Sequence, residues 1–258
     1  MAFTIKSPEE IAVLREGGRR LAHVVAKVAR NTVPGATTVE LNALSEKLIL
    51  EMGDQPSFLG YTPRGAKRPF PAAICISIND EVVHGIPNEN ARVIEEGDII
   101  GLDCGITHKG LITDHAITVI AGTGDAKAEQ LVRKTKEALM AGIRAAIGGA
   151  KVGDIGAAVE AVGKKHGYGI VFELGGHGVG HRVHEEPYIP NMGVQGEGIT
   201  LIPGLVIAIE PMFTEGTPRV KLMPDGYTFV TKDGSRAAHF EHTIAITEGE
   251  PEILTVEI

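Results

Sequence analysis

The sequence of 258 residues contains little cysteine and no long apolar run. Its two cysteines, Cys75 and Cys104, are too few for a framework of disulfides, which predicts reduced thiols in a cytoplasmic protein. No stretch of about 18 consecutive apolar residues occurs, so no transmembrane helix is expected. The first ten residues carry charges early and lack an apolar stretch of the length found in signal peptides. These absences argue against a secreted or membrane-embedded protein.

Positive charge is also scarce. Lys and Arg number 25 against 33 Asp and Glu, which gives a formal net charge of −8. Because no long Lys/Arg run offsets this excess, DNA or RNA is not expected as the main partner. Hydrophobic residues make up 43% of the chain and charged residues 22%, values ordinary for a globular protein with a real core.

Local patterns divide the chain into helices and strands. Capping boxes at Ser7/Glu10 and Thr37/Glu40 predict two helices, the first ending before Pro34 and the second near Met52. Apolar spacing predicts a second helix pair over 126–147 and 155–166. Runs rich in β-branched residues predict strands over 73–78, 98–107, 111–120, 205–213 and 241–247. A helix pair followed by strands, occurring twice, predicts an α+β fold.

The sequence also repeats itself. Residues 33–53 align without a gap on residues 147–167, and the later motifs keep the same order in both parts. The matches downstream pair His84 to Pro87 with His184 to Pro187, 97–103 with 204–210, and 114–118 with 241–245. We infer two similar halves, about 1–122 and 123–258, that together form one pseudo-symmetric domain of residues 1–258.

This pairing makes four carboxylates equivalent in two sets: Asp103 with Glu210, and Asp114 with Glu241. Each lies in an apolar, strand-like segment, where a charge costs several kcal/mol, as an order of magnitude, unless something compensates it. A single such residue could be a solvated strand position or a salt-bridge partner. Four of them related by a repeat are expected to converge, and four carboxylates at one centre repel each other without a cation.

The turn at 108–110 supports this convergence. Asp103 and Asp114 are equidistant from a midpoint at 108.5, so they are expected near one another across a hairpin. A one-residue bulge at Gly110 would shift them only slightly. Cys104 should point to the opposite face of its strand, as a core residue and not a ligand.

A glycine- and histidine-rich stretch follows at 175–187. Its four glycines disfavour a helix and favour a strand or loop whose backbone approaches a site. His177 lies opposite Ser77 in the repeat, so one metal would gain an imidazole that the other lacks. His84 and His184 are paired, as suits two donors flanking a substrate. For each histidine alone, a surface or core position is the plain alternative.

Carboxylates with one imidazole and no thiolate favour divalent Mn, Fe, Co or Zn. Two such ions can hold and deprotonate a water and stabilise a tetrahedral oxyanion. Hydrolysis of an amide bond is the chemistry that such a centre predicts.

The motifs that carry these residues resemble those of type I methionine aminopeptidases: CISINDEVVHGIP (75–87), GLDCG with TDHA (101–116), GHGVGHRVHEEP (176–187), IEPM (209–212) and FEHTIAIT (240–247). The resemblance implies a pita-bread fold with two divalent metal ions. It places the ligands at Asp103, Asp114, His177, Glu210 and Glu241. By analogy Asp114 and Glu241 bridge the ions, Asp103 chelates one, and His177 and Glu210 hold the other.

The resemblance also implies the reaction and its catalytic residues. His84 and His184 match histidines that contact the substrate and the developing oxyanion, and Glu210 is the candidate proton shuttle. The substrates would be nascent polypeptide N-termini with a small second residue. The methionine pocket would comprise Tyr61, Cys75, Val183 and Tyr227, with Phe58 nearby.

This pocket departs from the family pattern. The family has an aromatic residue where Val183 stands and Trp where Tyr227 stands, and this sequence has no Trp. The segment 62–74 is longer than the usual connection, which leaves the position of Phe70 in the pocket wall open.

Two other functions fit parts of the pattern. A prolidase shares the fold and ligands but carries a preceding domain, whereas the catalytic-type fold begins here at residue 1. A non-catalytic, ribosome-associated protein on this scaffold would be expected to lose ligands, and this sequence keeps them.

The remaining expectations concern partners. Arg64, Lys67 and Arg68 could contact ribosomal RNA or the nascent chain, although a solvated loop is the simpler interpretation. We expect a monomer with no membrane partner. The Met1-Ala2 start itself fits the substrate preference, which predicts a mature protein beginning at Ala2.

Overall fold

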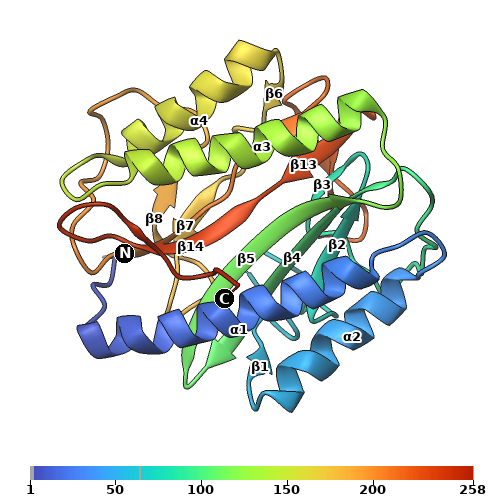
Figure 1. Cartoon of the computed structure of the whole chain (residues 1–258), viewed down its shortest axis with the longest axis horizontal. Helices are drawn as coiled ribbons and strands as arrows, with labels where there is room; N and C mark the ends of the chain where they lie inside the picture. Colours follow the sequence, from blue (N-terminus) through green and yellow to red (C-terminus); the bar gives the residue numbers. More distant parts are fainter. Residues whose placement is uncertain (1–2, 64, 258) are drawn as a thin grey trace.

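Two pairs of helices cover one face of a twisted antiparallel sheet in the computed structural model (Figure 1). The structure describes residues 3–63 and 65–257. The predicted substrate-like start Met1-Ala2 and the predicted loop residue Arg64 lie outside these residues. Within the described part of the chain, no helix has the length and apolarity needed to cross a membrane.

The helices begin where side chains satisfy their first backbone N–H groups. Helices α1 (Pro8–Asn31) and α2 (Thr38–Glu51) start at the two predicted capping boxes. Helix α3 (Ala126–Ala145) also begins as predicted. Helix α4 (Val152–His166) begins three residues earlier than predicted, because the Asp154 carboxylate accepts the Lys151 N–H and closes its first turn.

The main sheet is centred on a long hairpin. Its strands β4 (Ile99–His108) and β5 (Leu111–Ile120) were both predicted. The sheet order is β1-β4-β5-β14-β9-β7-β8, with β2 paired to β4 and β15 paired to β14. The other strands are β1 (Gln55–Pro56), β2 (Ile74–Ile78), β7 (Gly176–Gly178), β8 (Glu185–Ile189), β9 (Val206–Ile209), β14 (Glu241–Ala245) and β15 (Glu252–Ile253).

Short strands form two smaller sheets beside it. One contains β13 (Ala237–His239), β10 (Met212–Thr214) and β6 (Gly169–Ile170), and the other β11 (Val220–Leu222), β12 (Phe229–Thr231) and β3 (Glu81–Val83). The single strand predicted over 205–213 was therefore wrong. Glu210 and Pro211 divide it into β9 and β10, since proline has no N–H to donate to a ladder.

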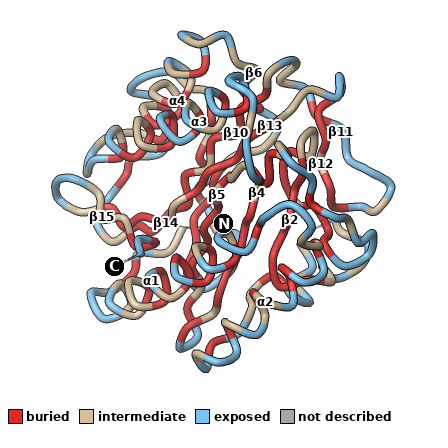
Figure 2. The backbone as a smooth tube through the Cα atoms, turned by 45° about the vertical axis from the view of Figure 1, so that its right-hand side comes forward, coloured by how far each residue is buried: buried red, intermediate tan, exposed pale blue. Residues whose placement is uncertain are grey.

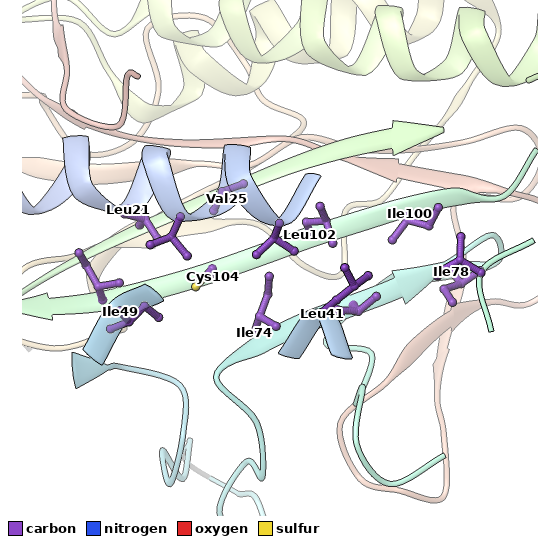
Figure 3. Packing of buried hydrophobic residues seen from close by; sticks show 14 of the residues in the cluster. Leu21, Val25, Leu41, Ile49, Ile74, Ile78, Ile100, Leu102 and Cys104 are labelled. Carbon is purple, nitrogen blue, oxygen red and sulfur yellow. The ribbon is translucent and has the colours of Figure 1, made fainter. Parts of the chain in front are cut away.

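Alternation along β4 separates the core from the site. Leu102 and Cys104 are fully buried and pack, with Leu21 of α1 and Leu41 of α2, in one apolar cluster (Figure 3). Cys104 is thus a core residue, as predicted. Figure 2 shows this buried centre as continuous red strands between more exposed helix surfaces. Because successive side chains point to opposite faces, Asp103 faces away from α1 and α2.

Candidate active site

Asp103 and Asp114 share the sheet face opposite the helices, but not at the predicted register. The turn is Lys109 and Gly110, both with positive φ (48° and 84°), so His108 pairs with Leu111. Asp103 therefore lies opposite Ala116, and Asp114 opposite Gly105. The predicted midpoint of the hairpin, 108.5, was one residue too low, because the two-residue turn places the true midpoint between Lys109 and Gly110. The carboxylates are diagonal neighbours on one face, still within reach of a shared site.

Glu241 joins them from the neighbouring strand. In β14 it pairs with Ala116, which on its other side pairs with Asp103. Directly opposed residues point to the same face, so the two carboxylates flank the small Ala116 side chain across three strands. Ala116 is fully buried, and its methyl group leaves the space above it to the carboxylates.

His177 and Glu210 approach from the other side of the pocket. The His177 Nε2 atom in β7 lies 3.6 Å from Glu210 Oε1, at the end of β9. Potential ligand atoms of Asp114, His177 and Glu241 all lie within 4.8 Å of one another. All five predicted ligand residues line a single pocket.

The charges of this cluster are unusual for a protein interior. Burial, with the nearby charge of Glu210, raises the pKa of Asp103 to about 7. Burial and mutual repulsion raise the pKa values of Asp114 and Glu241 well above their usual range. Among the described residues, Asp103 Oδ1, Asp114 Oδ1 and Glu241 Oε1 are buried without a hydrogen-bond partner. Buried, unpartnered carboxylate oxygens around a histidine nitrogen fit a divalent cation.

His84 and His184 line the same pocket. Burial lowers the pKa of His84 to about 4. The pKa of His184, which lies on the more open side of the pocket, is also lowered, by loss of solvation and by His177 beside it. The His184 and His177 rings are 4.4 Å apart, and His184 Nδ1 lies 2.8 Å from the Tyr61 hydroxyl. Both shifts favour the neutral form of the imidazole.

An apolar wall adjoins the carboxylates. Cys75 in β2 pairs with Asp103 in β4, so its sulfur points into the same pocket. The predicted pocket residues Phe58, Tyr61, Cys75, Val183 and Tyr227 form one apolar cluster together with Phe70. Phe70, whose place was left open, packs edge-on against Tyr227 with ring centroids 5.1 Å apart.

The segment 62–74 is fastened to this wall. The Tyr227 hydroxyl donates a hydrogen bond to the Arg68 carbonyl oxygen, which a Trp side chain at this position could not do in the same way. The Arg68 guanidinium is paired with Glu89 and also donates to the Asp225 carbonyl oxygen. Its charge is thus engaged within the protein, whereas Lys67 is exposed.

Two further histidines lie differently with respect to the pocket. His239, missed in the sequence analysis, is buried and points its Nε2 atom toward Glu210 Oε2 at 3.5 Å. Its position two residues before Glu241 was the only signal. His181 lies outside the pocket, where its Nε2 atom pairs with Glu10 at 2.8 Å. Because His239 approaches a pocket residue and His181 lies outside the pocket, the position of a histidine in the sequence does not by itself identify a site residue.

Comparison with known proteins places this arrangement in a family. Residues 12–248 match the model of metallopeptidase family M24. A methionine aminopeptidase of Aquifex aeolicus is 46% identical over 257 residues, which are 99% of each chain. A crystal structure of methionine aminopeptidase from Thermotoga maritima has a TM-score of 0.94 at 40% identity, covering 99% of this chain and 100% of that one.

A more distant structure shares the fold alone. The prolidase of Pyrococcus horikoshii has a TM-score of 0.74 at 23% identity, and 64% of its length is covered. The predicted α+β, pita-bread fold is confirmed by these neighbours. From the match of the family model and the full-length relatives, the chain belongs to metallopeptidase family M24.

Proposed function

We propose that this chain is a metal-dependent aminopeptidase that removes the N-terminal methionine from proteins and peptides with a small second residue. The observation that carries the proposal is the meeting of four carboxylates and His177 beside an apolar, sulfur-containing wall in one pocket. The relatives named methionine aminopeptidases, matched over nearly their whole length, support the same reaction.

The proposed metal ligands are Asp103, Asp114, His177, Glu210 and Glu241, and we propose that they hold two divalent ions. Their buried oxygen atoms without partners support this assignment. The chemistry supplied by ions bound there is a water of lowered pKa and a polarised scissile carbonyl. Co, Mn, Fe and Zn all suit this set of oxygen and nitrogen donors.

The neighbouring residues act on the substrate. We assign proton transfer to Glu210, which reaches the pocket from the end of β9. Neutral His84 and His184 can each donate one N–H group, to the substrate backbone or to the oxyanion that develops on the scissile carbonyl. For His184 the donor is Nε2 when its Nδ1 atom accepts the Tyr61 hydroxyl proton.

The apolar wall is the proposed binding site of the methionine side chain. Tyr61, Cys75, Val183 and Tyr227 present ring, sulfur and methyl surfaces, which suit a flexible thioether. Val183 is smaller than the aromatic residue of the family pattern. Phe70 and Tyr227, which pack edge-on against each other, belong to the same wall.

The organisation of the chain is part of the proposal. We propose one catalytic domain, residues 1–258, made of the similar halves 1–122 and 123–258. The helix pairs α1/α2 and α3/α4 and the pairing of β5 with β14 support this division. We further propose that the chain acts in the cytoplasm as a monomer. Size-exclusion chromatography with light scattering tests the oligomeric state.

Transient contact with the ribosome is a separate part of the proposal. The exposed Lys67 is compatible with transient contact to ribosomal RNA, while Arg68 is occupied by Glu89. Replacing Lys67 with Ala and measuring salt-dependent cosedimentation with ribosomes tests this contact. An unchanged salt dependence would dispose of it.

The reaction is tested with metal-free protein. The protein is incubated with Met-Ala-Ser, Met-Lys-Ser or an Ala-Pro dipeptide, with Mn, Fe, Co or Zn added in turn, and released amino acid is measured. We expect metal-dependent release of Met from Met-Ala-Ser alone. Glu241→Ala should abolish it, while Glu252→Gln, on a partly exposed ion pair, should not. Cleavage of the Ala-Pro dipeptide in preference would favour a prolidase instead.

Metal binding is tested separately from catalysis. Isothermal titration should find two ions per chain in the wild type and fewer in Glu241→Ala. The same ions should raise the melting temperature, because a ligand at roughly 100 times its Kd adds about 2.7 kcal/mol of stability. Tight metal binding without any peptide hydrolysis would support a binding protein on this scaffold.

A further inference from the structure

A buried ion pair joins the N-terminal segment to Glu185, the residue that follows His184 of the pocket. The Lys6 and Glu185 side chains are 0% and 7% exposed, and Lys6 Nζ lies 2.6 Å from Glu185 Oε2. The Thr4 hydroxyl donates to the same oxygen at 2.6 Å. A buried pair of this kind is costly unless its remaining hydrogen-bonding capacity is satisfied. The second Glu185 carboxylate oxygen, Oε1, supplies the remaining hydrogen bonds.

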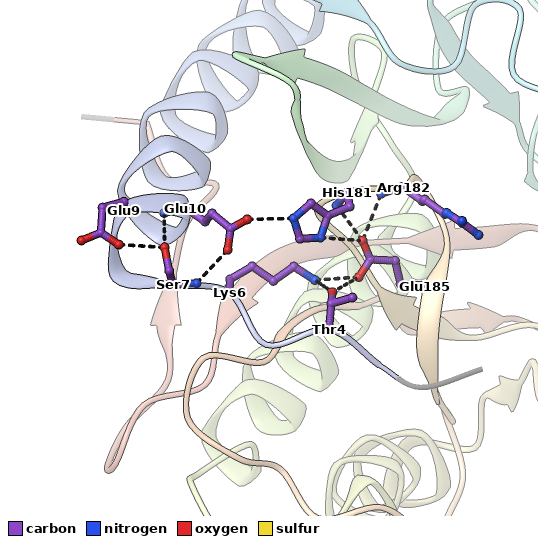
Figure 4. Close-up of polar contacts among 8 residues, drawn as sticks. All are labelled: Thr4, Lys6, Ser7, Glu9, Glu10, His181, Arg182 and Glu185. Atoms are coloured by element: carbon purple, nitrogen blue, oxygen red, sulfur yellow. Dashed lines mark hydrogen bonds and ion pairs between the residues drawn. The ribbon is translucent and has the colours of Figure 1, made fainter.

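Glu185 Oε1 holds a turn of the chain. It accepts the backbone N–H groups of His181 at 2.6 Å and Arg182 at 3.0 Å. The turn, residues 179–184, joins β7 to β8, and Glu185 is the first residue of β8. One carboxylate thus receives four donors, two from the turn and two from the N-terminal arm (Figure 4).

The arm, residues 3–7, is itself anchored at its backbone. Ile5 forms an antiparallel bridge with Leu205, and the Lys6 N–H donates to the Gly204 carbonyl oxygen at 2.8 Å. Space for Lys6 depends on Gly180, where an added Cβ would lie 2.5 Å from Lys6 Cε. The arm and the turn therefore fit each other through both charge and shape.

The turn ends in two pocket residues. Val183 belongs to the apolar wall, and His184 is the imidazole beside His177. Their positions depend on the path of the backbone at 181–182, which is where Glu185 binds. In the other half of the repeat the residue after the histidine is Gly85, which has no side chain to do this.

We propose that Glu185, with Lys6 on the N-terminal arm, is a positioning residue that sets Val183 and His184 in the substrate site. This inference rests on the proposed peptidase function. The arm thereby supports the substrate site, although none of its residues lines the pocket. A displacement of about 1 Å in a catalytic group can lower the rate by up to about 100-fold, so the pair is expected to affect turnover.

The test uses Glu185→Gln and Lys6→Met in the full-length, metal-loaded enzyme. In Glu185→Gln an NH2 group replaces one carboxylate oxygen, and it cannot accept hydrogen bonds from the donors that surround it. We therefore expect kcat/KM for Met-Ala-Ser to fall by about 10- to 100-fold. Metal affinity should change by less than about threefold, since no proposed ligand lies in the turn. Thr4→Val should lower kcat/KM by about 5- to 25-fold, because it removes both the hydrogen bond that Thr4 donates to Glu185 and the one that it accepts from Lys6, and Thr4→Ser should restore it.

Glu252→Gln is the matched control, because it alters a carboxylate that pairs with Arg15 of α1 and, among the described residues, makes no hydrogen bond to the turn. Its kcat/KM should stay within about twofold of the wild type. Unchanged kinetics in both Glu185→Gln and Lys6→Met would overturn the proposal. Parallel loss of metal binding would also overturn it, because the pair would then support the whole fold.

Hydrogen exchange separates this proposal from the proposed function. In Glu185→Gln the amides of His181 and Arg182 should exchange faster, while those around His84 keep their protection. That result supports the positioning role even if the wild type released no methionine. Unchanged exchange at both amides would contradict the role whatever the activity.

Discussion

His84 and His184 occupy matching places in the two proposed halves, yet they are held by different means. His84 follows β3 with a positive φ of 61°, and the next residue, Gly85, is fixed from both sides. The Gly85 N–H donates to Ser77 Oγ, and its carbonyl oxygen accepts the Ile76 N–H. His84 is thus held by tight contacts at Gly85, and the start of β12 adds to them: the Thr228 hydroxyl donates to the His84 carbonyl oxygen at 3.4 Å, and the Phe229 ring packs edge-on against the imidazole.

His184 depends on residues far away in the sequence. Its turn is held by Glu185, whose partner Lys6 lies 179 residues earlier, and its ring is held by the Tyr61 hydroxyl. The difference between the two imidazoles is therefore in the kind of support: a closely packed main chain at Gly85 for His84, and an ion-paired carboxylate and a hydroxyl for His184. Substitutions around His84 should mainly affect folding, and those around His184 mainly turnover.

The largest effect is expected from removing the imidazoles themselves. His84→Ala and His184→Ala should each lower kcat by about 100- to 1,000-fold, the usual effect of losing one donor to a developing oxyanion. Isothermal titration should find metal affinity nearly unchanged. A large loss for only one of them would assign the oxyanion contact to that histidine and leave substrate binding to the other.

Gly85→Ala should show how rigidly His84 is held. An added Cβ would lie 2.2 Å from the Ile76 carbonyl oxygen, a main-chain atom of β2 that cannot move away cheaply. We expect a loss of about 1–3 kcal/mol in the free energy of unfolding, measured by urea denaturation. Gly249→Ala, where nothing lies within 4 Å, is the control and should be near neutral. Equal stability of the two variants would contradict a rigid His84 segment.

The comparison also shows what a sequence can and cannot predict. Both capping boxes and the four carboxylates in apolar runs were predictable, because they depend on residues within a few positions of each other. The hairpin register was missed by one residue because it depends on which two residues form the turn, Lys109 and Gly110. Local patterns therefore locate elements better than they fix their register.

Long-range contacts account for what the sequence did not reveal. His239 approaches Glu210 from another sheet, and Lys6 reaches Glu185 across most of the chain. Nothing in the spacing of these residues distinguishes them from surface charges. Pro211 can be read in the sequence, but the sequence does not show that the chain changes from one sheet to another there. That change depends on the strands β13 and β6, which pair with β10.

Tyr61→Phe probes the side-chain support of His184. It removes the hydroxyl that lies 2.8 Å from Nδ1 and keeps the ring in the pocket wall. One lost hydrogen bond of about 1 kcal/mol corresponds to a decrease in kcat of about fivefold. Tyr227→Phe, which removes a hydroxyl bonded to the Arg68 carbonyl oxygen, should instead raise KM more than it lowers kcat. An identical kinetic change in both variants would contradict separate roles.

The smallest expected effect is a pH dependence of stability that arises from Glu185, next to His184, and has no counterpart at His84. Burial by itself would raise the pKa of Glu185, but hydrogen bonds from Lys6 and Thr4 outweigh it and lower the pKa from 4.5. The carboxylate faces Lys6, Thr4 and the turn amides, with His181 and Arg182 beside it and Glu10 beyond His181. The two backbone amides remain donors throughout the acid range.

Since the folded-state pKa is the lower one, Glu185 adds stability that is present above 4.5 and lost as pH falls through the folded value. The melting temperature of the wild type should therefore exceed that of Glu185→Gln at pH 7, and the difference should shrink below about pH 5. For Glu252→Gln the difference should be small at every pH, because its pair with Arg15 is partly exposed and screened by solvent. A constant difference for Glu185→Gln from pH 7 to about pH 3 would mean that packing, not charge, joins the arm to the turn.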